Sequence, residues 1–347
     1  IFKKYNYKIK NEKYSFLRIT LDTIDDFHLI KKVFENFRNN LFTFKDVINF
    51  YKKNNKIFLK NKKNSIQNEN RILIAGQKLW LRAKKSISGG NMLFSKRPDA
   101  FLPNKWPSYF SKAKGCNIYD LEGNKYNDFS IMGIGTNILG YSNKLVDKAV
   151  LKKLSDGNMS TLNCPEEVEL AEKLIYIHPW ADQVRFARSG GEANAIAIRL
   201  ARAYSKKRQK IAFCGYHGWH DWYLAANLQS KKNLNEHLLP GLKAGGVNKE
   251  LKKTVFPFRY NDFNGLKKII DKNKDVGIIK MEVIRNEKPK NNFLKKVRKL
   301  STEKNIILIF DECTTGFRQN FGGIHKLFNV EPDMMMLGKA LGNGYAI

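Results

Sequence analysis

The sequence has few cysteines and no long apolar run, and each shortage excludes a class of protein. Its four cysteines, Cys116, Cys164, Cys214 and Cys313, are widely separated and form no Cys-x-x-Cys pair. Neither a disulfide framework nor a zinc site is therefore expected, and the reducing cytoplasm is the compartment that fits best. No apolar stretch approaches the roughly 18 residues that a membrane span needs, and the N-terminal residues lack the pattern of a signal peptide.

Acidic residues are also scarce, with 32 Asp and Glu against 63 Lys and Arg, which gives a formal net charge of +31. Such a charge invites a nucleic-acid interpretation, but the excess is mostly lysine spread along the chain and not arginine gathered on one helix. A compositional bias explains it equally well. We therefore do not expect nucleic acid as the partner, and a non-catalytic protein that binds polyanions stays as an alternative.

The length bounds the architecture. A chain of 347 residues with 42% hydrophobic content can bury a sizeable core, so one large domain with a smaller unit is expected. The chain begins with Ile1 and stops at Ile347, just after a glycine-rich turn. We expect it to be a piece of a longer protein, and we expect these residues alone to be unstable or inactive.

Four segments are predicted along the chain. They are residues 1–60, with helices near 27–37 and 44–51; a polar linker, 61–70; residues 71–140, with a helix near 71–85 and a hairpin near 115–129; and a large domain, 141–347. The linker is dense in Lys, Asn and Gln and cannot bury an apolar face. The hairpin alternates apolar and polar residues around Glu-Gly-Asn.

Helices and strands alternate beyond residue 140. The pattern predicts helices near 143–154, 165–176, 191–206, 262–273 and 293–304, and buried strands near 183–187, 210–214, 277–281, 306–310 and 333–337. Such alternation predicts an α/β fold, a mostly parallel sheet with helices on both faces. In such sheets ligands bind at the carboxyl ends of the strands, so the residues that follow each strand are the candidates for chemistry.

Two of these positions carry groups that suit an anionic, flat ligand. Ser189, Gly190 and Gly191 follow the first predicted strand and open a helix, where backbone N–H groups can bind a phosphate. Tyr216 and His217 follow the second strand, and the tyrosine ring could stack on a flat cofactor. A simple turn with a helix cap, and ordinary packing of the two rings, are the structural alternatives. A metal held by His217 and His220 is not expected because no third ligand is present.

Two further positions carry ionisable groups. Asp311 follows five apolar residues and should be buried, so it needs a cationic partner, either a protonated ring nitrogen or an arginine such as Arg318. Lys339 lies between a short apolar run and several glycines, and is either a covalent catalyst or a surface lysine. A lysine for a Schiff base, an aspartate for a ring nitrogen, a phosphate turn and a tyrosine together predict a pyridoxal-phosphate site.

The motifs resemble those of class III pyridoxal-phosphate aminotransferases, and most closely the subgroup similar to glutamate-1-semialdehyde 2,1-aminomutase. The resemblance covers about 70–347 and rests on Phe310-Asp311-Glu312-Cys313-Thr314-Thr315-Gly316-Phe317-Arg318, Pro332-Asp333, Gly338-Lys339, Ser189-Gly190-Gly191-Glu192-Ala193 and Tyr216-His217-Gly218. It implies the type I fold of pyridoxal-phosphate-dependent transferases, truncated before the C-terminal domain, in a homodimer that acts on a small-molecule amino donor and acceptor.

The resemblance also implies a role for individual residues. Lys339 would form the Schiff base with pyridoxal 5′-phosphate and carry the proton between Cα and C4′, and Asp311 would hold the pyridine nitrogen protonated. Gly190 and Gly191, with Ser189, would bind the phosphate. Tyr216 would face the ring, with His217 supporting it.

Three departures bear on the substrate. The family commonly has Ser-Gly-Thr where this chain has Ser189-Gly190-Gly191. The loop that carries the aminomutase's carboxylate-binding arginine does not align cleanly, and Arg97 is the candidate for that role. The Glu-Pro stretch of the family lacks its proline here, and Asn286 is the candidate for a contact with the phenolic oxygen of the cofactor.

The first sixty residues resemble a different family. The stretch 18–26 and its helix are similar to the tail of a cytidylyltransferase of the spore-coat polysaccharide or CMP-sugar synthetase type, whose Asp-Thr aspartate, here Asp22, can hold magnesium. The nucleotide-binding body is missing. A sugar-activating module joined to an aminotransferase suggests amino transfer on an intermediate of surface polysaccharide synthesis. Cytidylyl transfer as the main activity of the full-length protein is the alternative.

Overall fold

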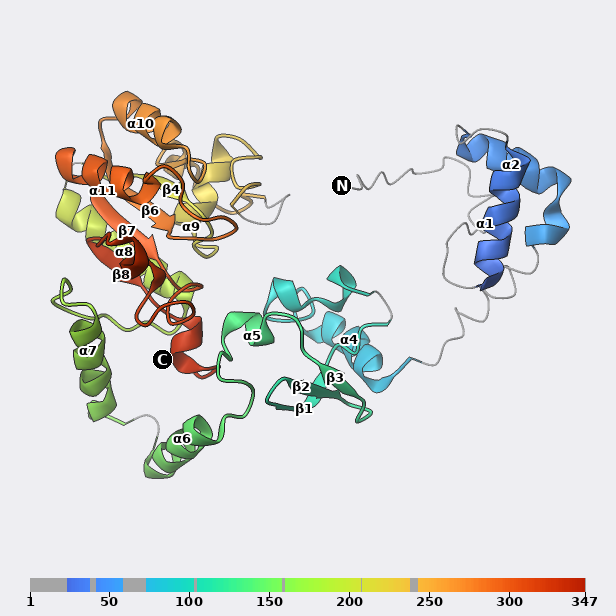
Figure 1. Ribbon diagram of the computed structural model, residues 1–347, viewed down its shortest axis with the longest axis horizontal. Helices are drawn as coiled ribbons and strands as arrows, with labels where there is room; N and C mark the ends of the chain where they lie inside the picture. The colour runs from blue at the N-terminus through green and yellow to red at the C-terminus, as the bar shows by residue number, and fades with distance from the viewer. Residues whose placement is uncertain are drawn as a thin grey trace. The chain divides into compact units, whose positions relative to one another are not determined.

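The structure, a computed structural model, describes residues 24–37, 42–58, 73–102, 105–157, 160–206, 208–237 and 243–346 (Figure 1). It divides into two compact units, Ile1–Tyr109 and Phe110–Ile347, which are described one at a time. None of the helices in these described ranges is long and apolar enough to cross a membrane. The domain limits inferred from the sequence stay predictions, and the linker 61–70 and Asp22 lie outside the described residues.

The first unit is helical. Its helices are α1 (Ile24–Asn36), α2 (Phe44–Lys53) and α4 (Ala75–Ser86), followed by two short 3-10 turns, η2 (Phe94–Lys96) and η3 (Pro98–Ala100). Thr43 caps α2 by accepting from the Asp46 amide while the Asp46 carboxylate accepts from the Thr43 amide, so two free amides at the start of the helix are satisfied together. A small core forms around Leu29, Val33 and Phe50. The three helices predicted here are confirmed.

The second unit begins with a small antiparallel sheet, β1 (Phe110–Lys114), β2 (Asn117–Asp120) and β3 (Lys125–Asn127). The buried carboxylate of Asp120 organises the β2–β3 turn, because it accepts from the amides of Glu122 and Asn124 and from the Tyr126 hydroxyl. The predicted hairpin is confirmed. Three helices follow: α5 (Met132–Gly135), α6 (Lys144–Asp156) and α7 (Pro165–Ile177).

A five-stranded parallel sheet forms the centre of this unit. Its order is β5 (Val255–Pro257), β4 (Lys210–Cys214), β6 (Val276–Glu282), β7 (Ile307–Asp311) and β8 (Met334–Met336). The helices of this part are α8 (Gly190–Ser205), α9 (Asp221–Leu224), α10 (Phe263–Lys272) and α11 (Phe293–Glu303), with 3-10 turns η4 (Ala225–Leu228), η5 (Lys249–Leu251), η6 (Ile324–Phe328) and η7 (Lys339–Gly342).

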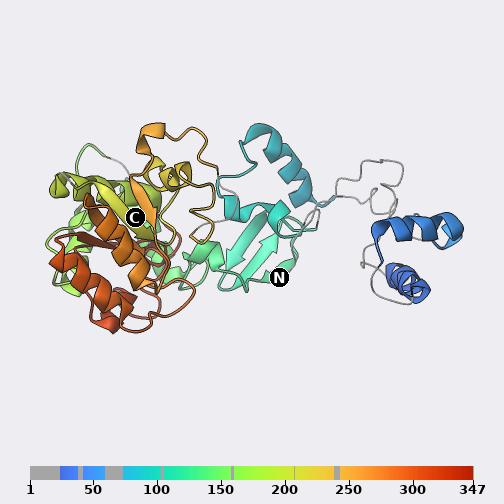
Figure 2. The same ribbon diagram turned by 90° about the horizontal axis from the view of Figure 1, so that it is seen from above.

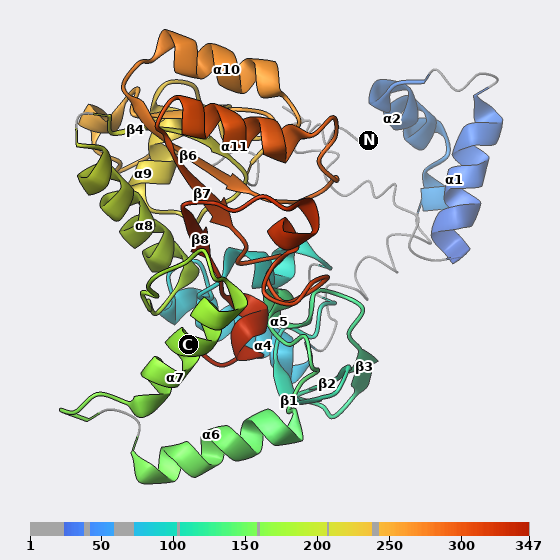
Figure 3. The same cartoon turned by 60° about the vertical axis from the view of Figure 1, so that its left-hand side comes forward.

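Helices cover both faces of this sheet, which lies between them (Figures 2 and 3). Alternate residues of each strand belong to two different cores. Ile279, Met281 and Phe310 pack with α10 and α11, whereas Ile278 and Ile309 pack with α8 and α9. The α/β fold class predicted from the sequence is confirmed.

The predicted strand at 183–187 is wrong. These residues have no regular secondary structure, and none of the strands in the described ranges pairs with them. The alternation of apolar Val184 and Phe186 with other residues favours an extended conformation, but a strand forms only when a second strand supplies hydrogen bonds. The edge strand β5 was missed because only three residues of it pair.

Candidate active site

The carboxyl edge of the sheet brings together four segments that are far apart in the sequence. Asp311 ends β7, Glu282 ends β6, Tyr216 and His217 follow β4, and Lys339 begins η7 after β8. Parallel strands present their carboxyl ends on one edge, which is why residues in these positions meet. The candidate residues named from the sequence therefore lie at one edge of the sheet.

Asp311 is the electrostatic centre of the edge, and its side chain is only 5% exposed. Its Oδ2 lies 2.9 Å from Nδ1 of His217, and its Oδ1 accepts from the Cys313 amide at 3.1 Å. Burial alone would raise the pKa of Asp311, but the hydrogen bond from His217 and the nearby charge of Lys280 outweigh it and hold the pKa below its ordinary value. Burial lowers the pKa of His217, and its hydrogen bond to Asp311 opposes that shift; Nδ1 donates to the carboxylate, and Nε2 lies 3.2 Å from the Cys214 carbonyl oxygen.

Glu282 and Tyr216 form the neighbouring part of the edge. The Tyr216 amide donates to Oε2 of Glu282 at 3.0 Å, and the same oxygen lies 3.7 Å from Nε of Arg285. Burial raises the pKa of Glu282 to about 7. The Tyr216 side chain is 36% exposed, and burial together with the charge of Asp311 raises its pKa. Tyr216 thus has a partly open ring that is held through its backbone.

Ser189, Gly190 and Gly191 form the start of α8. The Ser189 hydroxyl accepts from the Glu192 amide, and the Glu192 carboxylate accepts from the Arg188 amide. Two side chains therefore cap the first turn of the helix. A Cβ on Gly191 would lie 2.8 Å from the ring of His220. This contact explains the departure from the family's Ser-Gly-Thr, because a threonine here would displace His220.

Cys313 joins this turn to the lysine loop. A Cβ on Gly190 would lie 3.8 Å from the Cys313 sulfur, and one on Gly338 would lie 3.6 Å from the same atom. The start of α8 and the residue before Lys339 therefore both lie close to Cys313, in the loop that follows Asp311. The predicted phosphate turn and the predicted catalytic lysine are brought together as expected.

Lys339 is half-buried and has a backbone φ of +47°, which is unusual for a residue with a side chain. Its ammonium donates to the Thr314 hydroxyl at 3.2 Å, and no carboxylate lies within ion-pair distance of it in the described part of the chain. The loop is held on its other side by Asn343, whose side-chain oxygen accepts from the Leu139 amide. A hydroxyl group therefore positions the amine, and no carboxylate in the described part of the chain pairs with it.

The other two predicted residues are described by their own surroundings. Asn286 is exposed in the loop beyond β6, and Arg97 belongs to the first unit, where it pairs with Asp99 at 3.4 Å. Their predicted contacts with cofactor and substrate stay predictions. Arg318, the alternative partner of Asp311, instead donates to the carbonyls of Thr314 and Gly135, and the described contacts include no ion pair between it and Asp311.

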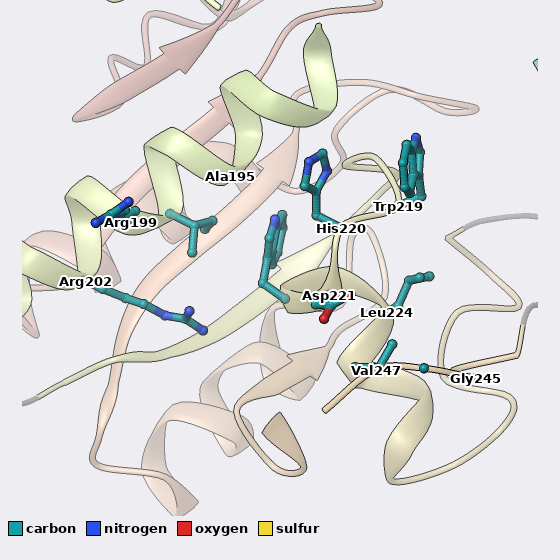
Figure 4. A pocket seen from close by; sticks show the side chains of 12 residues that line it. Ala195, Arg199, Arg202, Trp219, His220, Asp221, Leu224, Gly245 and Val247 are labelled. Carbon is teal, nitrogen blue, oxygen red and sulfur yellow. The ribbon is translucent and has the colours of Figure 1, made fainter. Parts of the chain in front are cut away.

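A pocket of about 670 Å³ lies beside this edge (Figure 4). It is lined by residues of α8, of α9 with the two residues before it, and of the loop 245–247, among them Arg199, Arg202, Trp219 and His220. Lys339 and Asp311 do not line it. His220 is the link, because it forms part of the pocket wall and also packs against Gly191. The pocket therefore borders the start of α8 and not the aspartate and lysine.

Three buried charged residues were given no role in the sequence interpretation: Lys280, Glu282 and Glu312. Lys280 and Glu282 interrupt the apolar run of β6, and this interruption was the available signal. Glu312 accepts from the amides of Ile324 and His325, from His325 Nδ1 and from the Thr315 hydroxyl. It acts as a structural carboxylate that holds the loop beyond β7.

Comparison with known proteins places this geometry in one family. The aminotransferase class-III family matches residues 103–347. The chain is 35% identical over 283 residues to the 3-aminobutyryl-CoA aminotransferase of Cloacimonas acidaminovorans (strain Evry), with 79% of this chain and 64% of the relative covered. It is 34% identical to the glutamate-1-semialdehyde 2,1-aminomutase of Saccharolobus islandicus (strain L.S.2.15 / Lassen #1), with 79% and 63% covered.

A solved structure agrees. The PLP internal aldimine form of the Sphingopyxis sp. MTA144 FumI protein is 25% identical, with a TM-score of 0.66 over 78% of this chain and 63% of that one. The chain thus spans just under two thirds of the relatives that it matches. The predicted enzyme class and its cofactor, pyridoxal 5′-phosphate, are confirmed at the level of the family, whereas the cytidylyltransferase tail stays a prediction. The chain belongs to the class III aminotransferase family.

Proposed function

We propose that the protein transfers amino groups with pyridoxal 5′-phosphate, as an aminotransferase or aminomutase acting on small amino and keto compounds. One observation carries the proposal. An ionised, buried Asp311, held by His217 at 2.9 Å, lies on the same sheet edge as the un-neutralised amine of Lys339. A buried, ionised carboxylate and a lysine amine without a carboxylate partner, both at one sheet edge, are the groups that a pyridinium aldehyde requires.

The residues present fit the cofactor. Asp311 would keep a ring nitrogen protonated, since its pKa lies low and its charge is only partly satisfied by neutral donors. The amides of Gly190 and Gly191 at the start of α8 would bind a phosphate, because these two residues add no side chain of their own there. When bound, the cofactor supplies an electron sink for charge that develops at Cα.

The chain's own groups perform the remaining tasks. Lys339 would hold and move the proton at Cα, a task that needs its amine neutral for part of the cycle, and the positive ring beside it favours that state. Tyr216 would face the ring and exclude water from one side of it. His217 would keep Asp311 oriented through its Nδ1 proton.

Four finer assignments are also part of the proposal. Arg97 as the substrate-carboxylate residue, Asn286 as a contact to the phenolic oxygen, and a homodimer are all supported by the family resemblance alone. The names of the two relatives favour a substrate with an amino group close to a carboxyl or acyl group. Amino transfer on an intermediate of surface polysaccharide synthesis is supported by the resemblance of residues 18–26 to a cytidylyltransferase tail.

Reduction with borohydride tests the proposal on the protein in its natural length. We expect a visible absorbance band when pyridoxal 5′-phosphate is added, loss of the band on reduction, and a pyridoxyl label on Lys339 found by peptide mapping. Lys339→Ala should lose both band and label, while the exposed Lys299→Ala should keep both. A label on another lysine, or no band at all, would contradict the proposal.

A further inference from the structure

Lys280 is a lysine in the interior of the sheet. It lies in the middle of β6, in register with Phe213 of β4 and Ile309 of β7, and its side chain is 0% exposed. Strand alternation puts it on the same sheet face as Ile278, which is the face that α8 covers. Its amine is thus shielded from water.

The Lys280 amine has no hydrogen-bond partner in the described part of the chain. The nearest opposite charge is Oδ2 of Asp311, at 4.0 Å. A buried amine without a hydrogen bond is costly, and an apolar residue of similar volume would fill the position without that cost. Packing therefore does not account for a lysine here.

The surroundings of the amine contain one carboxylate in ion-pair range and few other ionisable groups. Asp311 and Cys313 approach it from β7 and the loop beyond, Glu282 from its own strand, and His217 from the loop after β4. Burial lowers the pKa of Lys280, and the charge of Asp311 opposes that shift. Asp311 already accepts from His217 and from the Cys313 amide, so Lys280 adds a cation that the carboxylate does not need for its hydrogen bonds.

We propose that Lys280 is a positioning residue whose ammonium competes with the ring nitrogen of bound pyridoxal phosphate for the charge of Asp311. This inference rests on the proposed role of Asp311. Two cations that share one carboxylate repel each other, so the ring nitrogen releases its proton more readily when Lys280 is charged. A ring without that proton would be a weaker electron sink for charge at Cα. The rate would then depend more strongly on proton transfer by Lys339.

The expected size of the effect follows from distance. The Lys280 amine lies 4.0 Å from Asp311, and a second cation bound to the same carboxylate would lie roughly 6 to 8 Å from that amine. At the effective dielectric constant of about 20 that suits such sites, this repulsion shifts a proton equilibrium by roughly one to two pH units.

An NMR titration of the cofactor's ring nitrogen tests this directly. The protein in its natural length is loaded with pyridoxal phosphate that carries an isotope label at that nitrogen, and the chemical shift is followed against pH. We expect Lys280→Met to hold the ring proton to a pH about one to two units higher than the wild type does, a change of roughly tenfold to a hundredfold in proton affinity. Lys280→Gln, which is also neutral, should behave in the same way.

Ile278→Met is the matched control, because Ile278 is a fully buried residue on the same strand and the same face, and this change adds no charge. Its titration should match the wild type. Equal midpoints in wild type and both Lys280 variants would overturn the inference, and so would a shift of equal size in the control. If neither Lys280 variant folds while the control does, the lysine is structural and the inference is wrong. A wild type that takes up no cofactor would instead refute the proposed function, so the two failures are distinguishable.

Discussion

Replacing Glu312 by glutamine tests whether a single buried carboxylate holds the loop beyond β7. Glu312 is 0% exposed and accepts four hydrogen bonds, from the Ile324 amide at 2.9 Å, the His325 amide at 2.9 Å, His325 Nδ1 at 2.6 Å and the Thr315 hydroxyl at 2.7 Å. A glutamine oxygen can replace only one carboxylate oxygen. In the best orientation its NH2 group faces the Ile324 amide and the Thr315 hydroxyl, which can turn to accept.

The cost follows from this count. The Ile324 amide is left without an acceptor, and the remaining bonds lose their charge assistance. At roughly 1.5 to 3 kcal/mol for a hydrogen bond to a charged group, Glu312→Gln should lower the free energy of unfolding by about 2 to 4 kcal/mol at neutral pH. The effect is specific to the buried network, because the fold and the sheet remain intact.

The pH dependence has a definite sign. Burial would raise the pKa of Glu312, but the hydrogen bonds from His325 and Thr315 outweigh it and lower the pKa below its ordinary 4.5. Below that value the unfolded state takes up a proton that the folded state resists, so the contribution is present above about 4.5 and is lost as the pH falls through the lower folded pKa. The gap between wild type and variant should therefore narrow on acidification.

Urea unfolding followed by circular dichroism at several pH values measures the gap. The control is Glu303→Gln on α11, whose exposed carboxylate lies 3.8 Å from Lys299 and whose loss should cost less than about 0.5 kcal/mol. A Glu312→Gln variant as stable as this control at neutral pH would refute the reasoning.

Two further changes test the same sheet. Burial raises the pKa of Glu282 from 4.5 to about 7, so between these values the folded state holds a proton that the unfolded state has lost, and stability should fall as the pH rises through that window. In urea unfolding, Glu282→Gln should abolish this fall, which amounts to about 3 kcal/mol of unfolding free energy across the window, and an equal pH dependence in the two proteins would contradict the assignment. A Cβ on Gly277 would lie 2.0 Å from the Arg208 carbonyl oxygen, so Gly277→Ala should lower the melting temperature through a loss of about 3 kcal/mol, whereas Gly245→Ala, with nothing within 4 Å, should change little. A Gly277→Ala protein that melts with the wild type would show that β6 can shift.

Local patterns were enough to place most of the helices and four of the five strands of the large sheet. The helix at 293–304 and the strand at 306–310 have strong periodicity, and both occur within one or two residues of the prediction. The stretch 183–187 has a similar pattern but no partner strand, and β5 has a partner but only three paired residues. A strand depends on its neighbour, and a neighbour distant in sequence leaves no local signal.

The sequence by itself determined the chemical identity of the candidate site. Asp311 after an apolar run, Lys339 among glycines, and the Ser189 turn at a helix start each follow from short-range rules about burial, loop conformation and helix ends. Only the tertiary structure decided how these groups are charged. The hydrogen bond from His217, the amine of Lys280 at 4.0 Å and the raised pKa of Glu282 depend on which strands are neighbours and which faces are dry. Electrostatic effects act through space, and their size is set by distance and exclusion of water, neither of which the linear order of residues contains.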